Sequence, residues 1–491
     1  MLRTSSYTIY VDLPDSRDEV LLIHGYTGAY DRVSRPVARF LRSLSGKRGA
    51  NGNGNGTGDG AGPRAETVEA LTRRGYLTEK THEDEEVLVG RMGRALHEHA
   101  TRHQPGYVFM PTYSCNLRCP YCFQSHMRSD PGYGHLLRTM TPEVVDRIFT
   151  AMPGIEERHG LDPTAERDRG ILFFGGEPLL AANRPIVEYI FRKGQSLNRP
   201  KFSAISNGTE IEAYRDLLGP DKISFLQITL DGVPAEHDRK RVYAGGGGTF
   251  EKIAANIDMA LELGVRISAR INLDRRNAAG VPALIEEIDK RGWRASPLFL
   301  AYAAAIHSAG DAGPELMDSW VLRKQVSALG RRHPAVRRLG HLDDSLRGRL
   351  RTVFESRDNP TPSFKASFCA AHTTMYIFDP FADVYACWEH TGDPEFRIAR
   401  VAEDGEVVFE EERRDAWRNR NILSNPVCRR CRYAFYCGGG CANLAMGRTG
   451  NLDSSFCDGF AQRFRATAAK TYLDFLAGKT AEETQEPACD R

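Results

Sequence analysis

The sequence has no apolar run long enough to cross a bilayer and no excess of charge of either sign. Its longest apolar stretch, near residues 298–306, is far shorter than the roughly 20 residues of a membrane helix. Residues 1–20 hold no apolar core of signal-peptide length and already reach an acid at Asp12. The 66 basic and 64 acidic residues nearly cancel, so nothing favours a nucleic-acid or anionic membrane partner. These absences predict a soluble, cytoplasmic protein.

What the sequence does have is length, apolar residues and clustered cysteines. Its 491 residues, 41% of them apolar, predict two or three domains with sizeable cores. A cytoplasmic chain seldom keeps structural disulfides, yet the sequence holds eleven cysteines. Three lie within residues 115–122, seven lie within 369–457, and Cys489 stands apart. Clustered cysteines in a reducing compartment point to metal binding.

The pattern of strands, helices and polar stretches divides the chain into five parts. These are a small N-terminal α+β domain (1–104), an α/β region (105–305), a helical connection (306–365), a cysteine-rich domain (366–477) and a disordered tail (478–491). In the first part, two strands and a helix precede a Gly/Asn-rich loop at 46–64, which is too polar to pack. A second helix and a closing strand follow. The cysteine-rich part shows little periodicity, as expected of a domain folded around metal.

Strands and helices alternate six times between residues 105 and 305. Such repeats predict a parallel α/β sheet that closes only in part, a partial (β/α)6 barrel. Thr141 followed by Pro142 predicts the start of one of the helices. In the fifth strand, near residues 265–272, apolar and polar residues alternate, whereas a strand buried on both faces would be almost wholly apolar. A polar inner face indicates a polar ligand inside the barrel.

Cys115, Cys119 and Cys122 directly follow the first predicted barrel strand, with the spacing C-x3-C-x2-C. Three thiolates can hold three irons of a cubane cluster and leave the fourth iron open for a ligand. The carboxyl-terminal rim of the strands, where this segment falls, is where α/β barrels place their active sites. A zinc knuckle with His126 as the fourth ligand is the alternative interpretation of this segment.

This cysteine motif, with the aromatic Tyr121 before its last cysteine, resembles the signature of radical S-adenosylmethionine (SAM) enzymes. The resemblance implies that the three cysteines bind a catalytic [4Fe–4S] cluster, which cleaves SAM reductively to a 5′-deoxyadenosyl radical. Segments after the later strands resemble the family's contacts to the amino group, carboxylate and ribose of SAM. The residues that carry this resemblance are Gly175, Gly176, Glu177, Pro178, Ser206, Asn207, Asp231 and Arg270.

The seven later cysteines resemble the SPASM domain, a C-terminal extension of some radical SAM enzymes that binds two auxiliary [4Fe–4S] clusters. The resemblance assigns Cys428, Cys431, Cys437 and Cys457 to the distal cluster, and Cys369, Cys387 and Cys441 to the nearer one. Ala382 replaces a glycine of the family pattern, and no eighth cysteine occurs near Ser363. The nearer cluster therefore has an open iron or a ligand other than cysteine. A pair of zinc sites is the alternative.

The resemblance implies an oxidoreductase that acts on a peptide or protein. Ribosomal-peptide maturases of this type cross-link or otherwise oxidise a precursor, whereas anaerobic sulfatase-maturing enzymes form formylglycine. The N-terminal domain resembles the leader-binding domain of the maturases, which presents a strand edge to the precursor. Trp388 and Glu389 follow Cys387, where the sulfatase-maturing type would carry an Asp base.

We therefore expect a peptide maturase whose residues 1–104 bind the precursor's leader and are separable from catalysis. Its partners are the precursor peptide and an electron donor such as flavodoxin or ferredoxin. A sulfatase-maturing enzyme and a zinc-stabilised, non-enzymatic peptide-binding scaffold are the two alternatives. The metal that the purified protein contains, iron or zinc, would distinguish the scaffold from an enzyme.

Overall fold

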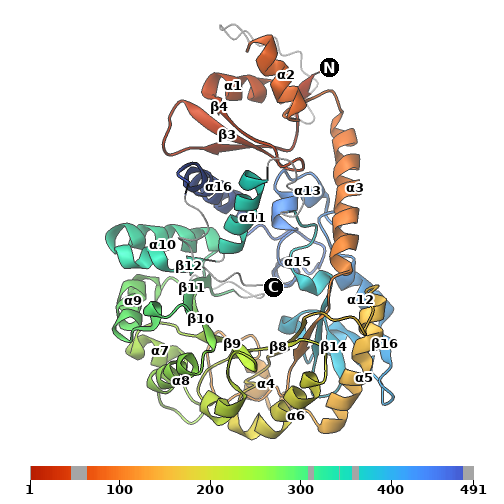
Figure 1. Ribbon diagram of the computed structural model, residues 1–491, viewed down its shortest axis with the longest axis vertical. Helices are drawn as coiled ribbons and strands as arrows, with labels where there is room; N and C mark the ends of the chain where they lie inside the picture. Colours follow the sequence, from red (N-terminus) through yellow and green to blue (C-terminus); the bar gives the residue numbers. More distant parts are fainter. Residues whose placement is uncertain (1, 46–62, 308–314, 342, 357–363, 479–491) are drawn as a thin grey trace.

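A mixed sheet of eleven strands runs through the protein, in the order β12-β11-β10-β9-β8-β7-β6-β13-β14-β15-β16. The computed structural model describes residues 2–45, 63–307, 315–341, 343–356 and 364–478 (Figure 1). Apart from residues 63, 64 and 478, the Gly/Asn-rich loop and the C-terminal tail that the sequence predicts lie outside the described residues, as does Cys489. No helix in these ranges is long and apolar enough to span a membrane.

Six parallel strands from the middle of the chain lie side by side in sequence order, which confirms the predicted partial α/β barrel. They are β6 (Gly106–Phe109), β7 (Arg169–Phe173), β8 (Pro200–Ser206), β9 (Ile223–Thr229), β10 (Arg266–Leu273) and β11 (Phe299–Ala305). A short seventh strand, β12 (Gly340–His341), continues the parallel order.

Helices follow the strands and cover the outside of the sheet in the lower half of Figure 1. They include α5 (Pro142–Arg158), α6 (Arg184–Gln195), α7 (Pro234–Lys240), α8 (Phe250–Glu262), α9 (Val281–Lys290) and α10 (Ser319–Arg332). The predicted start of α5 is confirmed, because the side chain of Thr141 accepts a hydrogen bond from the Val144 amide and Pro142 opens the helix. Apolar residues of these helices and strands form one buried core.

The cysteine-rich region joins the same sheet. Strand β13 (Met375–Phe378) pairs in parallel with β6, and three antiparallel strands continue outward from it: β14 (Asp383–Tyr385), β15 (Arg397–Val401) and β16 (Val407–Phe409). The sequence analysis did not predict these strands, because segments of three to five residues are too short to show periodicity. Ala382, in the turn between β13 and β14, has a φ of 62°, a left-handed conformation that glycine adopts more easily.

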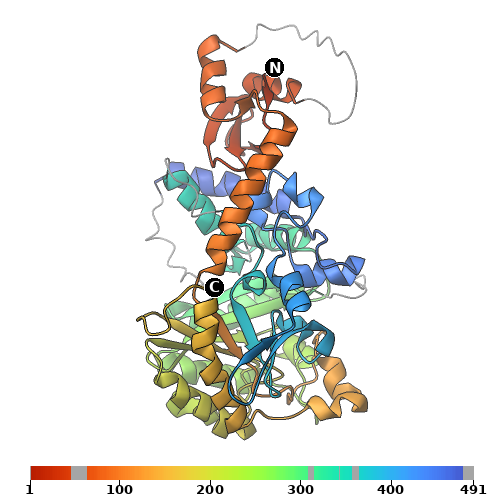
Figure 2. The same cartoon turned by 90° about the vertical axis from the view of Figure 1, so that its right-hand side faces the viewer.

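The N-terminal domain contains a three-stranded antiparallel sheet of β2 (Thr8–Asp12), β3 (Glu19–His24) and β4 (Tyr30–Ser34). The sequence analysis predicted only the first two strands, since β4 is short and mostly polar. Helices α1 (Arg35–Ser43) and α2 (Ala65–Arg73) follow, and β1 (Arg3–Thr4) pairs with the closing strand β5 (Leu77–Thr78). The long helix α3 (His82–Thr101) then runs from this domain to the barrel (Figure 2).

One face of the N-terminal sheet packs against the C-terminal half of the chain. Ile9 and Ile23 share a buried apolar cluster with Leu350 of α11 (Asp344–Glu355) and Phe464 of α16 (Phe460–Leu476). Cutting the chain after residue 104 would expose both sides of this cluster. The structure therefore argues against the expectation that residues 1–104 are separable, although the domain boundaries themselves stay predictions.

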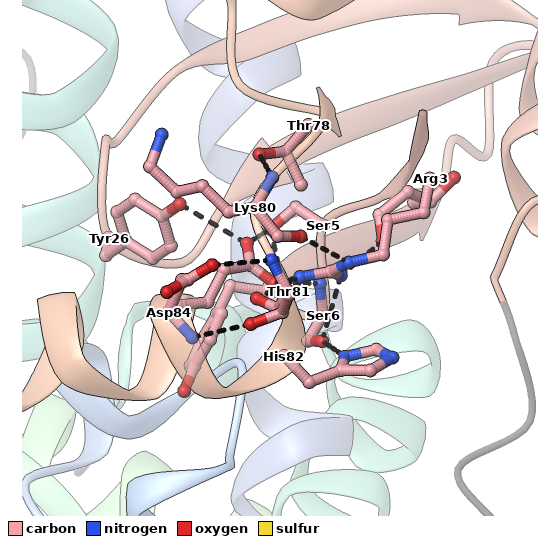
Figure 3. Close-up of polar contacts among 12 residues, drawn as sticks. Arg3, Ser5, Ser6, Tyr26, Thr78, Lys80, Thr81, His82 and Asp84 are labelled. Carbon is pink, nitrogen blue, oxygen red and sulfur yellow. Dashed lines mark hydrogen bonds and ion pairs between the residues drawn. The ribbon is translucent and has the colours of Figure 1, made fainter. Parts of the chain in front are cut away.

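A buried network of hydrogen bonds holds the start of α3 against the N-terminal domain (Figure 3). The Glu85 carboxylate is fully buried and accepts hydrogen bonds from Arg3 Nη2 (2.8 Å), Tyr26 Oη (3.3 Å) and Ser5 Oγ. Ser5 Oγ also lies 3.0 Å from His24 Nε2. Because a buried charge is tolerated only when it is paired and hydrogen-bonded, these bonds fix the direction in which α3 leaves the domain.

This network generates a prediction about pH. Burial lowers the pKa of His24 from 6.5 to about 4, against the opposing charge of Glu85. Above pH 6.5 His24 is neutral in the folded and unfolded states alike; below it only the unfolded state binds the proton, so stability falls as the pH falls toward 4. We expect His24 to cost the domain roughly 2 kcal/mol between pH 7 and pH 5.

Hydrogen exchange of the N-terminal domain, corrected for the intrinsic effect of pH on exchange, measures this loss. His24→Gln should remove most of the pH dependence, and His135→Gln at an exposed position should not. An equal pH dependence in the wild type and in His24→Gln would contradict the assignment.

Candidate active site

The loop that carries the first three cysteines is shaped by Gly175 and Gly176, which follow β7. Gly175 has a φ of 144°, and a Cβ atom on Gly176 would lie 2.3 Å from the carbonyl oxygen of Ser114. The amides of Gly176 and Glu177 donate to the carbonyl oxygens of Thr112 (3.1 Å) and Ser114 (2.8 Å). Only glycine permits this close approach, so the GGEP-like segment holds the chain that leads into Cys115.

The carboxylate of Glu177 forms hydrogen bonds with other residues of the protein. Its carboxylate accepts hydrogen bonds from Ser206 Oγ (2.8 Å) and from the amides of Asn207 (2.5 Å) and Leu179 (2.9 Å). Burial raises the pKa of Glu177 to about 7, and these three bonds oppose that shift. Glu177 thus ties the end of β7 to the end of β8, while the carbonyl oxygens of Glu177 and Pro178 accept hydrogen bonds from Asn183 Nδ2 (3.1 and 3.3 Å).

The three cysteines lie at the carboxyl-terminal rim of the sheet, in polar surroundings. Arg128 Nη2 donates to Cys122 Sγ (3.0 Å), and Asn207 Nδ2 lies 3.8 Å from Cys115 Sγ. Burial raises the pKa of Cys115 to about 11 and also raises that of Cys119. Bound iron stabilises thiolates that burial would otherwise keep protonated.

No group of three His, Cys, Asp or Glu side chains in the described ranges could hold a single metal ion. A cubane cluster needs no such convergence, because each of its thiolates binds a different iron. The donor set of Cys115, Cys119 and Cys122, with basic and amide side chains beside their sulfur atoms, therefore fits an iron–sulfur cluster.

Arg241 is a site residue that the sequence analysis missed. It is 6% exposed, and its Nη1 donates to Tyr121 Oη (2.9 Å), whose hydroxyl in turn donates to Asp231 Oδ2. Its positive charge opposes the rise in the pKa of Cys119. It lies near the end of α7 in a run of charged residues that looks like a solvated helix face, so only its contact with Tyr121, 120 positions earlier, reveals it.

Asp231 has one carboxylate oxygen that makes no hydrogen bond to any of the residues that the structure describes. Burial raises the pKa of Asp231, and its Oδ1 is buried without a hydrogen bond. A buried carboxylate oxygen without a partner is costly, so its presence at the end of a barrel strand indicates a ligand donor. A ribose hydroxyl, the group that the sequence resemblance implies, fits this position.

Arg270 projects from the polar face of β10, as the sequence predicted for that strand. Its Nε donates to Asn272 Oδ1 (2.8 Å), which leaves its terminal nitrogens for a ligand carboxylate. Its charge also acts on Glu389 and on His307, two ionisable groups without an assignment from the sequence. Although part of each side chain reaches solvent, burial raises the pKa of Glu389 to about 7 and lowers that of His307.

The seven later cysteines lie in two groups. Cys369, Cys387 and Cys441 influence one another electrostatically. The other four do the same: Cys428, Cys431, Cys437 and Cys457. Cys428 lies in the short helix α13 (Pro426–Arg429), Cys437 ends α14 (Ala434–Cys437), and Cys441 directly precedes α15 (Ala442–Thr449). The structure thus brings together the residues of each predicted ligand set; what they bind stays a prediction.

A buried arginine and a close-packed glycine join these two groups. Arg420 is 3% exposed and donates to the carbonyl oxygens of Gly440 (3.0 Å) and Ser454 (3.0 Å). Its charge acts on cysteines of both groups. A Cβ atom on Gly440 would lie 1.9 Å from the Phe456 carbonyl oxygen, so the segments that carry Cys441 and Cys457 pass in direct contact.

Comparison with known proteins agrees with this geometry. Residues 109–286 match the family model described as the Radical SAM superfamily. A cysteine-type anaerobic sulfatase-maturating enzyme of Clostridium novyi is 22% identical over 73% of this chain and 94% of its own length. The mycofactocin maturase MftC of Mycobacterium tuberculosis is 26% identical over 67% of this chain and 76% of its own.

A solved structure shares the fold. That of anSMEcpe with bound AdoMet and the Cp18Cys peptide superimposes with a TM-score of 0.56 at 17% identity, over 76% of this chain and 99% of that one. The chain therefore carries a radical SAM domain. It is an enzyme of the radical SAM superfamily, and a region rich in cysteine follows this domain.

The glycine contacts predict how the SAM cluster site can be broken without changing a cysteine. Gly176→Ala should displace the Ser114–Cys115 segment, because the new methyl group would overlap a backbone oxygen. We expect the variant to lose about four irons, those of one cubane cluster, and most SAM cleavage. Gly170→Ala in β7 is the matched control, because a Cβ atom there meets nothing within 4 Å. Full iron content in Gly176→Ala would refute the assignment.

Proposed function

We propose that this protein is a peptide maturase with one SAM-binding and two auxiliary [4Fe–4S] clusters. The observation that carries the proposal is the β6–β13 pairing, which joins the rim that bears Cys115 to the domain that bears the other cysteines. When bound, SAM and its reduced cluster supply a 5′-deoxyadenosyl radical that abstracts hydrogen from carbon. An electron donor such as flavodoxin or ferredoxin is the expected partner, and the cytoplasm the expected compartment.

The residues of the rim have distinct roles in this proposal. Cys115, Cys119 and Cys122 hold the SAM cluster. Asp231, restrained by Tyr121 and Arg241, accepts a hydrogen bond from the ribose of SAM. Arg270 pairs with the SAM carboxylate, and the carbonyl groups of the Gly175–Pro178 segment accept from its amino group. Ser206 and Asn207 act mainly by orienting Glu177 and the loop near Cys115.

A peptide substrate is supported by the relatives and by the N-terminal domain. By their names, one relative matures mycofactocin and another matures a sulfatase. The anSMEcpe structure contains a bound peptide. In the N-terminal domain β4 is an edge strand, and among the described residues no further strand pairs with it. An exposed edge is a docking site for an extended peptide.

A sulfatase-maturing activity is the second candidate, because the Clostridium novyi relative matches most of the chain. The two reactions leave different products. A cross-link removes two hydrogen atoms from the peptide, whereas formylglycine made from cysteine loses two hydrogen atoms and also carries an aldehyde oxygen, supplied by water, in place of the thiol sulfur. In both candidates Glu389, in the turn Trp388–His390 that follows Cys387 and within the electrostatic reach of Arg270, is the side chain that we expect to contact the substrate.

The function can be tested by co-expression with short peptides encoded beside this protein. We expect one of them to lose two hydrogen atoms, as measured by mass spectrometry. The variant with Cys115, Cys119 and Cys122 all changed to Ala should leave that peptide unchanged and produce no 5′-deoxyadenosine. Modification of the peptide by this triple variant would refute radical SAM chemistry. Loss of two hydrogen atoms together with an exchange of sulfur for oxygen would establish the second candidate.

The proposed docking edge can be tested at Arg32. The Arg35 amide donates to the Asp18 carbonyl oxygen, and the His24 amide donates to the Ala29 carbonyl oxygen. Hydrogen-bonded residues alternate along an antiparallel pair, so the N–H and C=O groups of Arg32 in β4 point away from β3. Arg32→Pro removes the outward N–H and should weaken peptide binding about tenfold or more, while Arg32→Ala keeps it. Peptide affinity measured by fluorescence anisotropy decides, and equal affinities of the two variants would exclude this edge.

A further inference from the structure

The loop that joins Cys428 to Cys431 is held from outside by the N-terminal domain. Three polar contacts connect them: Tyr7 Oη donates to the Arg429 carbonyl oxygen (2.8 Å), Arg432 Nη1 donates to the Thr8 carbonyl oxygen (2.7 Å), and Arg430 pairs with Glu86 (2.8 Å). Tyr7 and Thr8 lie at the start of β2, and Glu86 lies in the second turn of α3. The contacts join residues more than 340 positions apart, so only the folded state makes them.

Gly25, at the end of β3, brings the two backbones into direct contact. Its amide donates to the Tyr7 carbonyl oxygen (2.9 Å), and a Cβ atom on Gly25 would lie 2.3 Å from the Arg432 carbonyl oxygen. Any larger residue would push the loop away. Position 25 therefore requires glycine for this contact to form.

The contact continues into the protein interior. Cys428 is 9% exposed and belongs to the same apolar cluster as Tyr7 and Val89. Outside this cluster the loop has little cover, since Arg429 and Arg430 are exposed and Val427 is 65% exposed. The N-terminal domain therefore supplies much of the packing that gives Cys428 and Cys431 a defined position.

We propose that the N-terminal domain is a structural part of the distal auxiliary-cluster site, in which Tyr7, Gly25 and Glu86 position the loop of Cys428 and Cys431. These are positioning residues, because they touch the loop and not the cluster. The coupling is reciprocal: a cluster that requires the docked loop stabilises the docked domain by the same free energy. The proposal does not depend on which substrate the enzyme modifies or on whether the domain binds a leader.

The double variant Tyr7→Phe/Glu86→Gln tests this proposal, since it removes two contacts and keeps the apolar packing. We expect amides of residues 429–432 to exchange about fivefold faster or more. Iron content should fall from about twelve toward about eight, with the distal cluster's electron paramagnetic resonance signal reduced and that of the SAM cluster kept. The control is Tyr133→Phe/Glu98→Gln, which changes an exposed tyrosine and an exposed glutamate of α3.

The reciprocal measurement uses Cys457→Ala, outside the loop. Loss of the distal cluster in this variant should speed exchange in β2 of the N-terminal domain but not in α8 of the barrel. Full iron content with unchanged exchange of residues 429–432 in the Tyr7→Phe/Glu86→Gln variant would overturn the proposal. If Cys457→Ala loses its distal cluster without any change in β2, the coupling is not reciprocal and the proposal also fails.

Discussion

The position of β6 between β7 and β13 is the constraint on which the rest of this structure depends. Tyr107 pairs with Ile171 on one side and with Tyr376 on the other, so the barrel and the cysteine-rich region share backbone hydrogen bonds. The loop with Cys115 leaves the end of this strand. The position of the Cys115–Cys122 loop relative to the cysteines that flank β13 and β14 is therefore set by sheet geometry, which varies little, and not by a surface contact between two domains.

Around this frame, buried charges prepare the rim for a ligand. Glu177 spends its carboxylate on Ser206 and Asn207, whereas Asp231 keeps one oxygen without a partner. Arg241 stabilises the Asp231 carboxylate through Tyr121. The positive charge of Arg241 also opposes the rise in the pKa of Cys119. Groups that are oriented before a ligand binds need not reorganise when it does, which is the principal advantage of such a site.

The N-terminal domain belongs to the same physical system. Its sheet packs on α11 and α16, Tyr7 and Thr8 at the start of β2 contact the loop of Cys428, and α3 leads toward β6. The Glu85 network fixes α3 to the domain at one end. Near the other end, His97 Nε2 donates to the Arg418 carbonyl oxygen and His97 Nδ1 is hydrogen-bonded to Ser367 Oγ (both 2.8 Å). A domain that meets the barrel, α11, α16 and the cysteine-rich region cannot move without disturbing them, even though one edge of its sheet stays open.

The sequence by itself determined the class of protein and the barrel, and it nominated most of the candidate site residues. This was possible because the motifs are short, contiguous segments of the sequence: three cysteines at fixed spacing, and short polar motifs at strand ends one repeat apart. Only the tertiary structure decided that Arg241 joins Tyr121, that β13 pairs with β6, and that Tyr7 holds Arg429. Such contacts join residues that are far apart in the chain and often lie in short or polar segments, where no periodicity marks them. Packing of the whole chain, and not local preference, selects them.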